Sequence, residues 1–452
     1  MSITDAQISG HRKRLTKNQV RGFGAAWGGW ALDGMDSFIY ALVMVPALHD
    51  LLPRSGISGD AANTGFYGGL LFALFLVGWG LSLVWGPIAD RFGRVRTLML
   101  TIICYSTFTF LGAVATSVWQ LAAFRLLAGV GIGGEWSMGG TFVAEEWPEE
   151  RRKMGAGLMH TGYYFGIFLA AIANYTIGAH YGWRAMFAVG GIPALLVAFI
   201  RYGVNEPKRW QEKMREIGAR VAEEQKQQQT GCLRSQEWNM RHAFFALFSP
   251  EYRRRTALNS TYILVSITGL WAGSVYVPAA VTYLAARQGS DPVQGTRLAS
   301  YGTMLLSVGT IIGCIVLPVL AERFGRRLTL AIYFALMFVF ISLGFGYVFY
   351  LQEGALFWFM ICLFFLGIGG ANFAMYTLWL PEQYPTECRA SAFAFSTSVG
   401  RFAGAGITFL VGAGVSHFHT IGTPVALTSL AFIFGLLLLP FGKETKGELL
   451  PA

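Results

Sequence analysis

Charged residues are scarce in this sequence. Of its 452 residues, only 13% are Asp, Glu, Lys or Arg, whereas 54% are hydrophobic. Because soluble globular domains carry about 25% charged residues, this chain has too few charges to cover a surface that faces water. Disordered chains combine high charge with low hydrophobicity, so disorder is excluded as well. The composition predicts a protein with most of its surface in lipid, rather than a soluble enzyme.

Cysteines are also few, and cofactor motifs are missing. The five cysteines show no C-x-x-C spacing, so we expect neither a disulfide framework nor a metal site. The sequence has no phosphate-binding P-loop, so we expect no cofactor and a proton gradient as the energy source. Residues 129–134 satisfy G-x-G-x-x-G, but they lie in an apolar segment with no strand before it, which favours close helix packing.

Long apolar segments make up most of the chain. A transmembrane helix needs about 20 predominantly apolar residues. Twelve segments meet this criterion, and the fold class expected is therefore an all-α membrane protein with twelve transmembrane helices. They lie at 24–48, 63–86, 97–115, 118–143, 153–178, 184–203, 256–285, 300–320, 328–350, 355–380, 390–415 and 421–441.

The positions of Lys and Arg predict the orientation of these helices. With the N-terminus in the cytoplasm, 29 of the 35 basic residues fall in cytoplasmic segments and 4 in outer loops. Cytoplasmic loops of membrane proteins carry such an excess, so both termini are expected in the cytoplasm. The net charge of +10 then reflects topology and contact with anionic lipid. We expect no nucleic-acid partner.

Two pairs of similar motifs divide the chain into halves. ADRFGR at 89–94 returns as AERFGR at 321–326, and EEWPEERR at 145–152 returns as EQYPTECR at 382–389. The two offsets are nearly equal, which indicates that one six-helix unit has been duplicated in parallel. Such repeats place a substrate site between the halves near the middle of the membrane.

The duplication defines the expected domains. Residues 1–203 form an N-terminal six-helix bundle, and residues 256–452 form a C-terminal one. Between them, the polar segment 204–255 is expected to be a cytoplasmic linker with short helices.

These motifs resemble the major facilitator superfamily over essentially the whole chain. The resemblance rests on GPIADRFGRVR at 86–96, on the R-x-x-x-G-x-G-x-G stretch at 125–133 and on KETKG at 443–447. More narrowly, AAW at 25–27 and LDGMD at 32–36 are similar to the sialate:proton symporter branch, and the D-G-x-D element also to aromatic-acid:proton symporters. The resemblance implies transport of a small organic acid by rocking of two halves. Yeast lactate permeases carry an Asn/His/Asp signature in the seventh span. This signature has no counterpart at 256–275, which argues against lactate itself as the substrate.

Charged residues inside the predicted helices are the candidates for proton coupling. Each costs about 2.5–3.5 kcal/mol at the centre of a span, so it needs a partner or a wet cavity. Asp33 and Asp36 share one face of the first helix, and depth along the helices places Asp36 near Arg125 and Asp33 nearer Glu135. Our hypothesis is that Asp33 or Asp36 carries the proton, with Glu135 as an alternative. The competing interpretation is a static Asp–Arg pair that holds two helices together.

Arg401, in the eleventh segment, is the candidate for anion binding. No acid in the C-terminal spans can neutralise it, and a guanidinium matches a carboxylate with two hydrogen bonds. The competing interpretation is a structural arginine bound to carbonyl groups. Further candidates for substrate contact, for each of which core packing is the alternative, are Tyr40, His160, Trp271, Asn372 and Tyr376.

The repeated loop motif predicts a conformational latch rather than a substrate site. Glycine permits a tight turn between helices, and the charges can bind neighbouring helix ends. The residues of this predicted latch are Asp90, Arg91, Gly93 and Arg94 with their counterparts Glu322, Arg323 and Arg326.

Together these features predict a proton-coupled symporter of a small organic acid anion such as sialate, lactate or an aromatic acid. It is expected to be a monomer that crosses the plasma membrane many times. The alternative is a neutral sugar or polyol symporter, because Pro381-Glu382 and KETKG also resemble sugar porters. Arg401 argues against that alternative, and a transporter-like sensor without flux is a third hypothesis.

Overall fold

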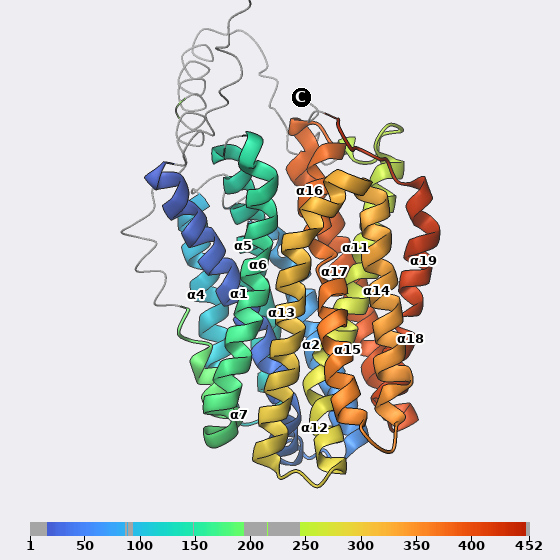
Figure 1. The fold of residues 1–452 in the computed structure, drawn as a ribbon. Helices are drawn as coiled ribbons and strands as arrows, with labels where there is room; N and C mark the ends of the chain where they lie inside the picture. Colours follow the sequence, from blue (N-terminus) through green and yellow to red (C-terminus); the bar gives the residue numbers. More distant parts are fainter. Residues whose placement is uncertain are drawn as a thin grey trace, which may run out of the picture.

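A computed structural model describes residues 16–85, 88, 94–147, 149–193, 215 and 245–448. All regular structure in this part of the chain is helical (Figure 1). The first half contains α1 (Lys17–Arg54), α2 (Ala61–Leu81), η2 (Ser82–Val84), α4 (Arg94–Gly112), α5 (Val118–Glu146), α6 (Glu149–Ala173), η3 (Asn174–Gly178) and α7 (Ala179–Val189). The second contains α11 (Arg253–Val275), α12 (Val277–Arg287), α13 (Pro292–Phe324), α14 (Arg326–Gly346), η4 (Val348–Tyr350), α15 (Ala355–Gly370), α16 (Phe373–Trp379), η5 (Pro381–Gln383), α17 (Thr386–Phe418), α18 (Gly422–Leu427), α19 (Leu430–Leu438) and η6 (Leu439–Phe441).

The all-α membrane fold expected from the sequence is confirmed. Within the described residues, 8 helical stretches are long and apolar enough to cross a membrane. Three of the other four predicted spans coincide with α5, with α6 and with the pair α11 and α12. The fourth, 184–203, begins in α7, and its residues 194–203 lie outside the described residues. Most of the predicted linker, 204–255, also lies outside the described residues.

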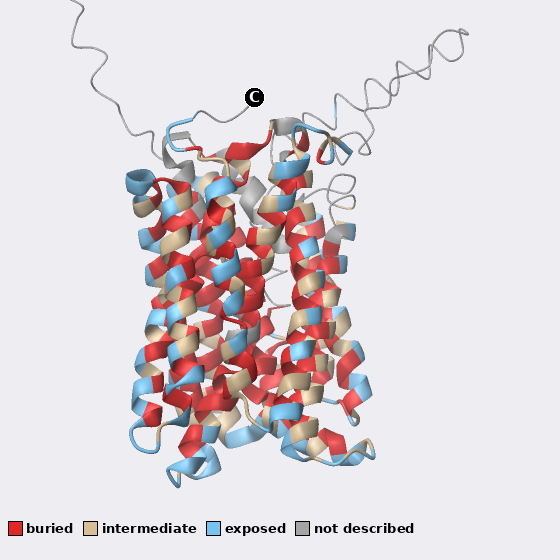
Figure 2. Ribbon diagram, turned by 90° about the vertical axis from the view of Figure 1, so that its right-hand side faces the viewer, coloured by how far each residue is buried: buried red, intermediate tan, exposed pale blue. Residues whose placement is uncertain are grey.

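The outer faces of the bundle are suited to lipid. Large apolar side chains are exposed there, among them Val319 at 68%, Phe357 at 64% and Leu437 at 67%. Figure 2 shows buried residues concentrated along the middle of the molecule and exposed ones along its flanks. Apolar exposure of this extent is rare on soluble monomers, so these faces contact the membrane interior.

The helix boundaries follow from local sequence signals. Asp60 and Asp291 cap α2 and α13, because each carboxylate accepts a hydrogen bond from a backbone N–H three residues later. The seventh predicted span is broken at Tyr276, which ends α11 and precedes Pro278 in the first turn of α12. Proline fits the first turn of a helix but breaks its interior, so the break follows from the sequence.

Close glycine contacts show the duplication in three dimensions. A Cβ atom on Gly78 of α2 would lie 2.0 Å from a backbone oxygen of α5, and one on Gly129 of α5 would lie 2.2 Å from a backbone oxygen of α2. In the second half, Gly309 of α13 and Gly367 of α15 make the same reciprocal approach, with both distances 2.1 Å. These positions follow their counterparts by 231 and 238 residues, close to the spacing of the repeated sequence motifs. Only glycine permits backbones to pack this closely.

The two halves meet along two helix pairs. Helix α17 packs along α2, and α13 packs along α6. The N-terminal end of α1 and the last described residues, 443–448, lie at one end of the bundle, which we call the termini end (Figure 1). At the opposite end, the Asn174 amide donates to Ser300 Oγ at 3.0 Å, and the Tyr301 hydroxyl donates to that of Tyr175 at 3.3 Å. These bonds join the halves at the end opposite the termini.

Candidate functional site

Among the described residues of the predicted spans, the charged side chains of α1, α5 and α17 are buried, as the sequence predicts. The exposed fraction is 0% for Asp33 and Asp36 on α1, 1% for Arg125 on α5 and 7% for Arg401 on α17. A buried charge in a membrane protein needs a compensating neighbour or water, so the surroundings of each group determine what it can do.

Arg125 lies in a compact pocket of the N-terminal half. Its guanidinium donates to Thr109 Oγ1 at 2.7 Å, and three aromatic rings lie around it, with that of Tyr40 at 6.0 Å and two phenylalanine rings at 5.4 Å. Asp36 lies near enough for its charge to act on Arg125, but neither of its carboxylate oxygens has a hydrogen-bond partner among the described residues. The pairing expected from helix depth therefore stays a prediction.

Arg401 instead faces a cavity between the halves. Residues of both halves contribute to the walls of this cavity. The guanidinium carbon of Arg401 lies 4.4 Å from the centre of the Trp79 ring on α2. Asp33 of the opposite half is near enough for its charge to act on Arg401, but it is not among the residues that line the cavity. The cavity is lined by Trp30, Trp79, His160, Tyr163, Tyr164, Ile263, Ile267, Trp271, Phe373, Thr397 and Arg401.

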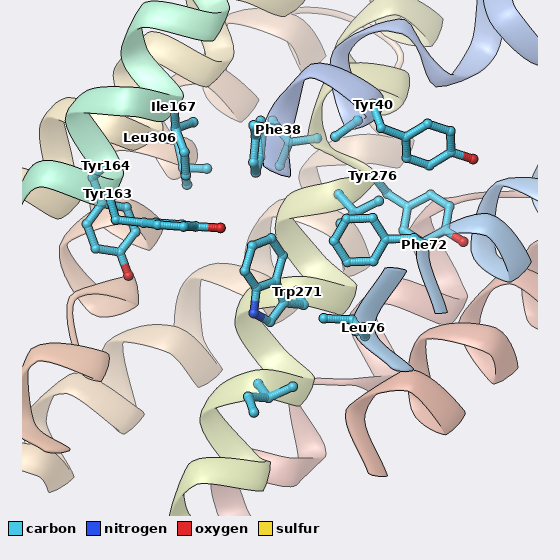
Figure 3. Close-up of a cluster of buried hydrophobic side chains, with 14 of the residues drawn as sticks. Phe38, Tyr40, Phe72, Leu76, Tyr163, Tyr164, Ile167, Trp271, Tyr276 and Leu306 are labelled. Carbon is cyan, nitrogen blue, oxygen red and sulfur yellow. The ribbon is translucent and has the colours of Figure 1, made fainter. Parts of the chain in front are cut away.

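Aromatic rings form most of this wall. The Trp271 ring lies 5.7 Å from that of Trp79 and 6.1 Å from that of Tyr163, both edge to face. Figure 3 shows Trp271 between Tyr163 and Tyr164 of α6 on one side and Phe72 of α2 on the other. Flat apolar walls around one guanidinium suit a small molecule that has a carboxylate and a flat apolar body.

A second, smaller cavity adjoins the first. The two share Tyr163, Tyr164 and Trp271. The second has hydroxyl groups in its wall, and its remaining lining residues are Phe38, Ile167, Ser274, Leu306, Ser307 and Thr310.

The residues predicted to bind substrate divide into two groups. Arg401, His160 and Trp271 line the first cavity. Tyr40, Asn372 and Tyr376 line neither cavity, because their polar groups are used in helix packing. They donate to the backbone oxygens of Gly68 at 3.2 Å, Gly369 at 2.9 Å and Tyr262 at 2.7 Å, respectively. The side chain of Glu135, on α5, lies outside the described residues.

Several lining residues were not foreseen from the sequence. Trp30 and Thr397 carried a usable signal, because they stand three residues before Asp33 and four before Arg401 and so share a helix face with them. Trp79 and Tyr163 carried none, since many aromatic residues occur in equally apolar segments.

Of the two copies of the predicted latch, the second, at residues 322–326, lies within the described residues. The Arg326 guanidinium donates to Glu322 at 2.9 Å and to both carboxylate oxygens of Glu382 at 2.8 and 3.0 Å. Glu382 belongs to the EQYPTECR repeat and was not expected here. The side chain of Arg323 lies over the adjacent Phe324 ring instead. Asp90, Arg91, Gly93 and the Arg94 side chain, the first copy, lie outside the described residues.

The C-terminal segment completes this cluster. The Glu444 carboxylate accepts hydrogen bonds from the backbone N–H groups of Arg326, Arg327, Thr445 and Lys446 at 2.9–3.1 Å. Partial burial disfavours the Glu444 carboxylate, but these donors outweigh burial and hold its pKa below the usual value. Because α14 begins at Arg326, the carboxylate also caps that helix.

Comparisons with known proteins agree with this architecture. The sequence profile described as "Major Facilitator Superfamily" matches residues 26–408. The chain is 29% identical to a probable 4-methylmuconolactone transporter of Cupriavidus pinatubonensis, over 96% of this chain and 93% of that one. It is 28% identical to the niacin transporter NiaP of Acinetobacter baylyi, over 93% of each chain. The solved xylose transporter XylE from E. coli has the same fold, with a TM-score of 0.73 at 19% identity over 96% of this chain and 100% of that one.

Proposed function

Because the chain belongs to the Major Facilitator Superfamily, and is thus a multi-pass transporter of the cell membrane rather than an enzyme, we propose that it carries a small organic acid anion together with protons. Transport would proceed by alternating access, with the helices before residue 204 and those after 255 as the two moving units. Two relatives are named as transporters of niacin and of 4-methylmuconolactone, which are small organic molecules, and this supports a small organic substrate.

The observation that carries this proposal is the position of Arg401. It is the one permanently charged side chain among the described residues of the first cavity, and the walls around it are aromatic. A guanidinium binds a carboxylate through two parallel hydrogen bonds, and the desolvated surroundings strengthen the interaction. A neutral sugar has no negative group for this guanidinium to bind, so the geometry favours an acid.

Asp33 supports coupling to protons. Its carboxylate acts on Arg401 from the opposite half, so a bound substrate carboxylate would share one guanidinium with a second negative group. A proton on Asp33 removes the excess charge and allows the loaded halves to rock. Asp36 acts on Arg125 within one half and is the alternative proton carrier.

Transport in proteoliposomes tests both parts of the proposal. We expect Arg401→Ala to weaken the binding of organic acids by tenfold or more, with the fold retained. We expect Asp33→Asn to abolish accumulation driven by a proton gradient but to retain exchange of labelled substrate across the membrane. Unchanged affinity in Arg401→Ala, or uptake of neutral hexoses in preference to acids, would contradict the anion assignment.

We further infer that the termini end faces the cytoplasm, because the excess of basic residues lies there in the sequence. In this orientation the cluster of Glu322, Arg326, Glu382 and Glu444 is cytoplasmic. It joins α13, α14, η5 and the C-terminal segment, so it acts as a latch that must loosen when the C-terminal half changes shape. We expect the protein to work as a monomer, because each half contributes to one complete cavity.

A further inference from the structure

We propose that the second cavity binds a hydroxyl group, or another hydrogen-bond donor, at the far end of the transported acid, and that Ser274 selects for it. The inference rests on the proposed function, since it assumes that the carboxylate of the same molecule is held at Arg401. It adds a substrate class, namely monocarboxylates with a hydroxyl opposite the acid group.

The hydroxyl groups on α13 can act only as acceptors toward this cavity. Ser307 Oγ donates its proton to the Thr303 carbonyl at 2.9 Å, and Thr310 Oγ1 donates to the Leu306 carbonyl at 2.8 Å. Each hydroxyl has one proton, which its own helix already uses, so only lone pairs remain. A ligand group that meets these oxygens must therefore bring a proton of its own.

Ser274 is the polar group that carries the proposal. The side chain is 2% exposed, and its Oγ has no hydrogen-bond partner among the described residues. It lines the second cavity and stands two residues before Tyr276, where the seventh span is broken. A buried hydroxyl without a partner is unfavourable, so a ligand that bonds to it gains affinity.

Charge distinguishes a hydroxyl from a second carboxylate at this place. None of the described residues that line the second cavity is charged. Its wall residue Tyr163 is within electrostatic reach of Asp33, Asp36 and Arg401, so an added anion would meet two acids and would have to share the Arg401 guanidinium with the first carboxylate of the same molecule. A carboxylate also brings no proton for Ser307 and Thr310. Dicarboxylates should therefore bind less well than hydroxy acids.

The shared wall allows one molecule to occupy both cavities. Tyr163, Tyr164 and Trp271 border each of them, so a ligand that passes beside Trp271 has its two ends in different surroundings. One end lies near the guanidinium, and the other near the hydroxyl groups. A rigid ring with its two substituents on opposite sides matches this arrangement.

Binding of four related acids to the purified full-length protein tests the proposal. The probes are benzoate, 4-hydroxybenzoate, 4-methoxybenzoate and terephthalate, with affinity measured by calorimetry. We expect 4-hydroxybenzoate to bind about five- to tenfold more tightly than benzoate, as one buried hydrogen bond provides. The methoxy acid can accept a bond from Ser274 but has no proton for Ser307 or Thr310, so it should gain less than the hydroxy acid, and terephthalate should bind more weakly than benzoate.

Variants assign the effect to this cavity. Ser274→Ala and Ser307→Ala should each reduce the advantage of the hydroxy acid to about twofold, with benzoate affinity unchanged. The control is Thr268→Val, which alters a buried hydroxyl of α11 that bonds to the Leu264 carbonyl and lines neither cavity. It should retain the full advantage.

The outcomes separate the two proposals. If the acids bind through Arg401 but the hydroxyl advantage is absent or survives both serine variants, the subsite is wrong and the anion assignment stands. If none of the four acids binds, both the subsite and the proposed function are contradicted.

Discussion

The guanidinium of Arg401 lies against the face of Trp79, with 4.4 Å between its central carbon and the ring centre. The two residues belong to α17 and α2, so the contact joins the halves at the wall of the first cavity. A cation over an indole ring is stabilised by about 0.5–2 kcal/mol. The ring supports the charge without neutralising it, so the guanidinium can still bind a carboxylate.

This contact predicts a role for Trp79 in affinity. In Trp79→Leu the arginine loses its aromatic support, and we expect organic-acid binding to weaken about three- to tenfold. Trp79→Phe should lie between that variant and the wild type. Trp119→Leu is the control, because Trp119 is 58% exposed on the outer surface and should have no effect. Equal dissociation constants for all four proteins would show that the contact does not support binding.

Trp79 and Trp119 also show what the sequence could not predict. Both are tryptophans close to apolar helical sequence, yet one is 3% exposed in the cavity wall and the other faces outward. In a soluble protein the polar face of a helix would distinguish them. In a membrane helix the lipid face and the cavity face are both apolar, so spacing gives no answer.

The site residues that could be predicted from the sequence are those whose side chains differ sharply in polarity from the apolar segments around them. Asp33, Asp36, Arg125 and Arg401 stand out because a charge in an apolar segment is costly, and all four are buried as expected. The duplication was visible because its motifs kept their spacing. Tyr376 was predicted to contact substrate, but its hydroxyl bonds to the Tyr262 carbonyl, a contact that depends on how two helices are rotated.

Asp36 and Asp33 should respond differently to neutralisation. Asp36→Asn removes the acid whose charge acts on Arg125 within the N-terminal half, and a buried charge that loses such a neighbour destabilises the fold. We therefore expect a clear fall in thermal stability, measured in detergent, with residual proton-driven uptake in the protein that remains folded. Asp33→Asn should abolish accumulation with a smaller fall in stability, because Arg401 keeps its contact with the Trp79 ring. If instead Asp36→Asn alone abolishes accumulation, the proton carrier is Asp36.

Glu444 predicts how the cytoplasmic cluster depends on pH. Its pKa is lowered in the folded protein, so its contribution to stability is complete above the usual value of 4.5 and is lost as the pH falls through the lower folded value. Glu444→Gln should therefore melt at a lower temperature than the wild type near pH 7, and the difference should shrink below pH 4.5. Because the carboxylate is partly exposed, the effect should be small, about 1–3 °C. A difference that does not change with pH would assign it to packing rather than charge.

The contacts between the halves at the end opposite the termini should control access to the cavities. Asn174 donates to Ser300 at 3.0 Å there, and this bond must break if that end opens. Asn174→Ala removes about 0.5–1.5 kcal/mol from the closed state, which corresponds to a two- to tenfold larger open population.

A cysteine in the second cavity reports that population. In Ser307→Cys, the thiol should react with a membrane-impermeant reagent added on the outer side, and the Asn174→Ala change should accelerate the reaction two- to tenfold. The same protein with Ser307 retained measures the background from native cysteines. The thiol itself is the same with and without the Asn174→Ala change, so a faster reaction reports opening. Equal rates in Ser307→Cys with and without that change would mean that this bond does not hold the end closed. Acceleration from the cytoplasmic side only would reverse the orientation inferred for the molecule.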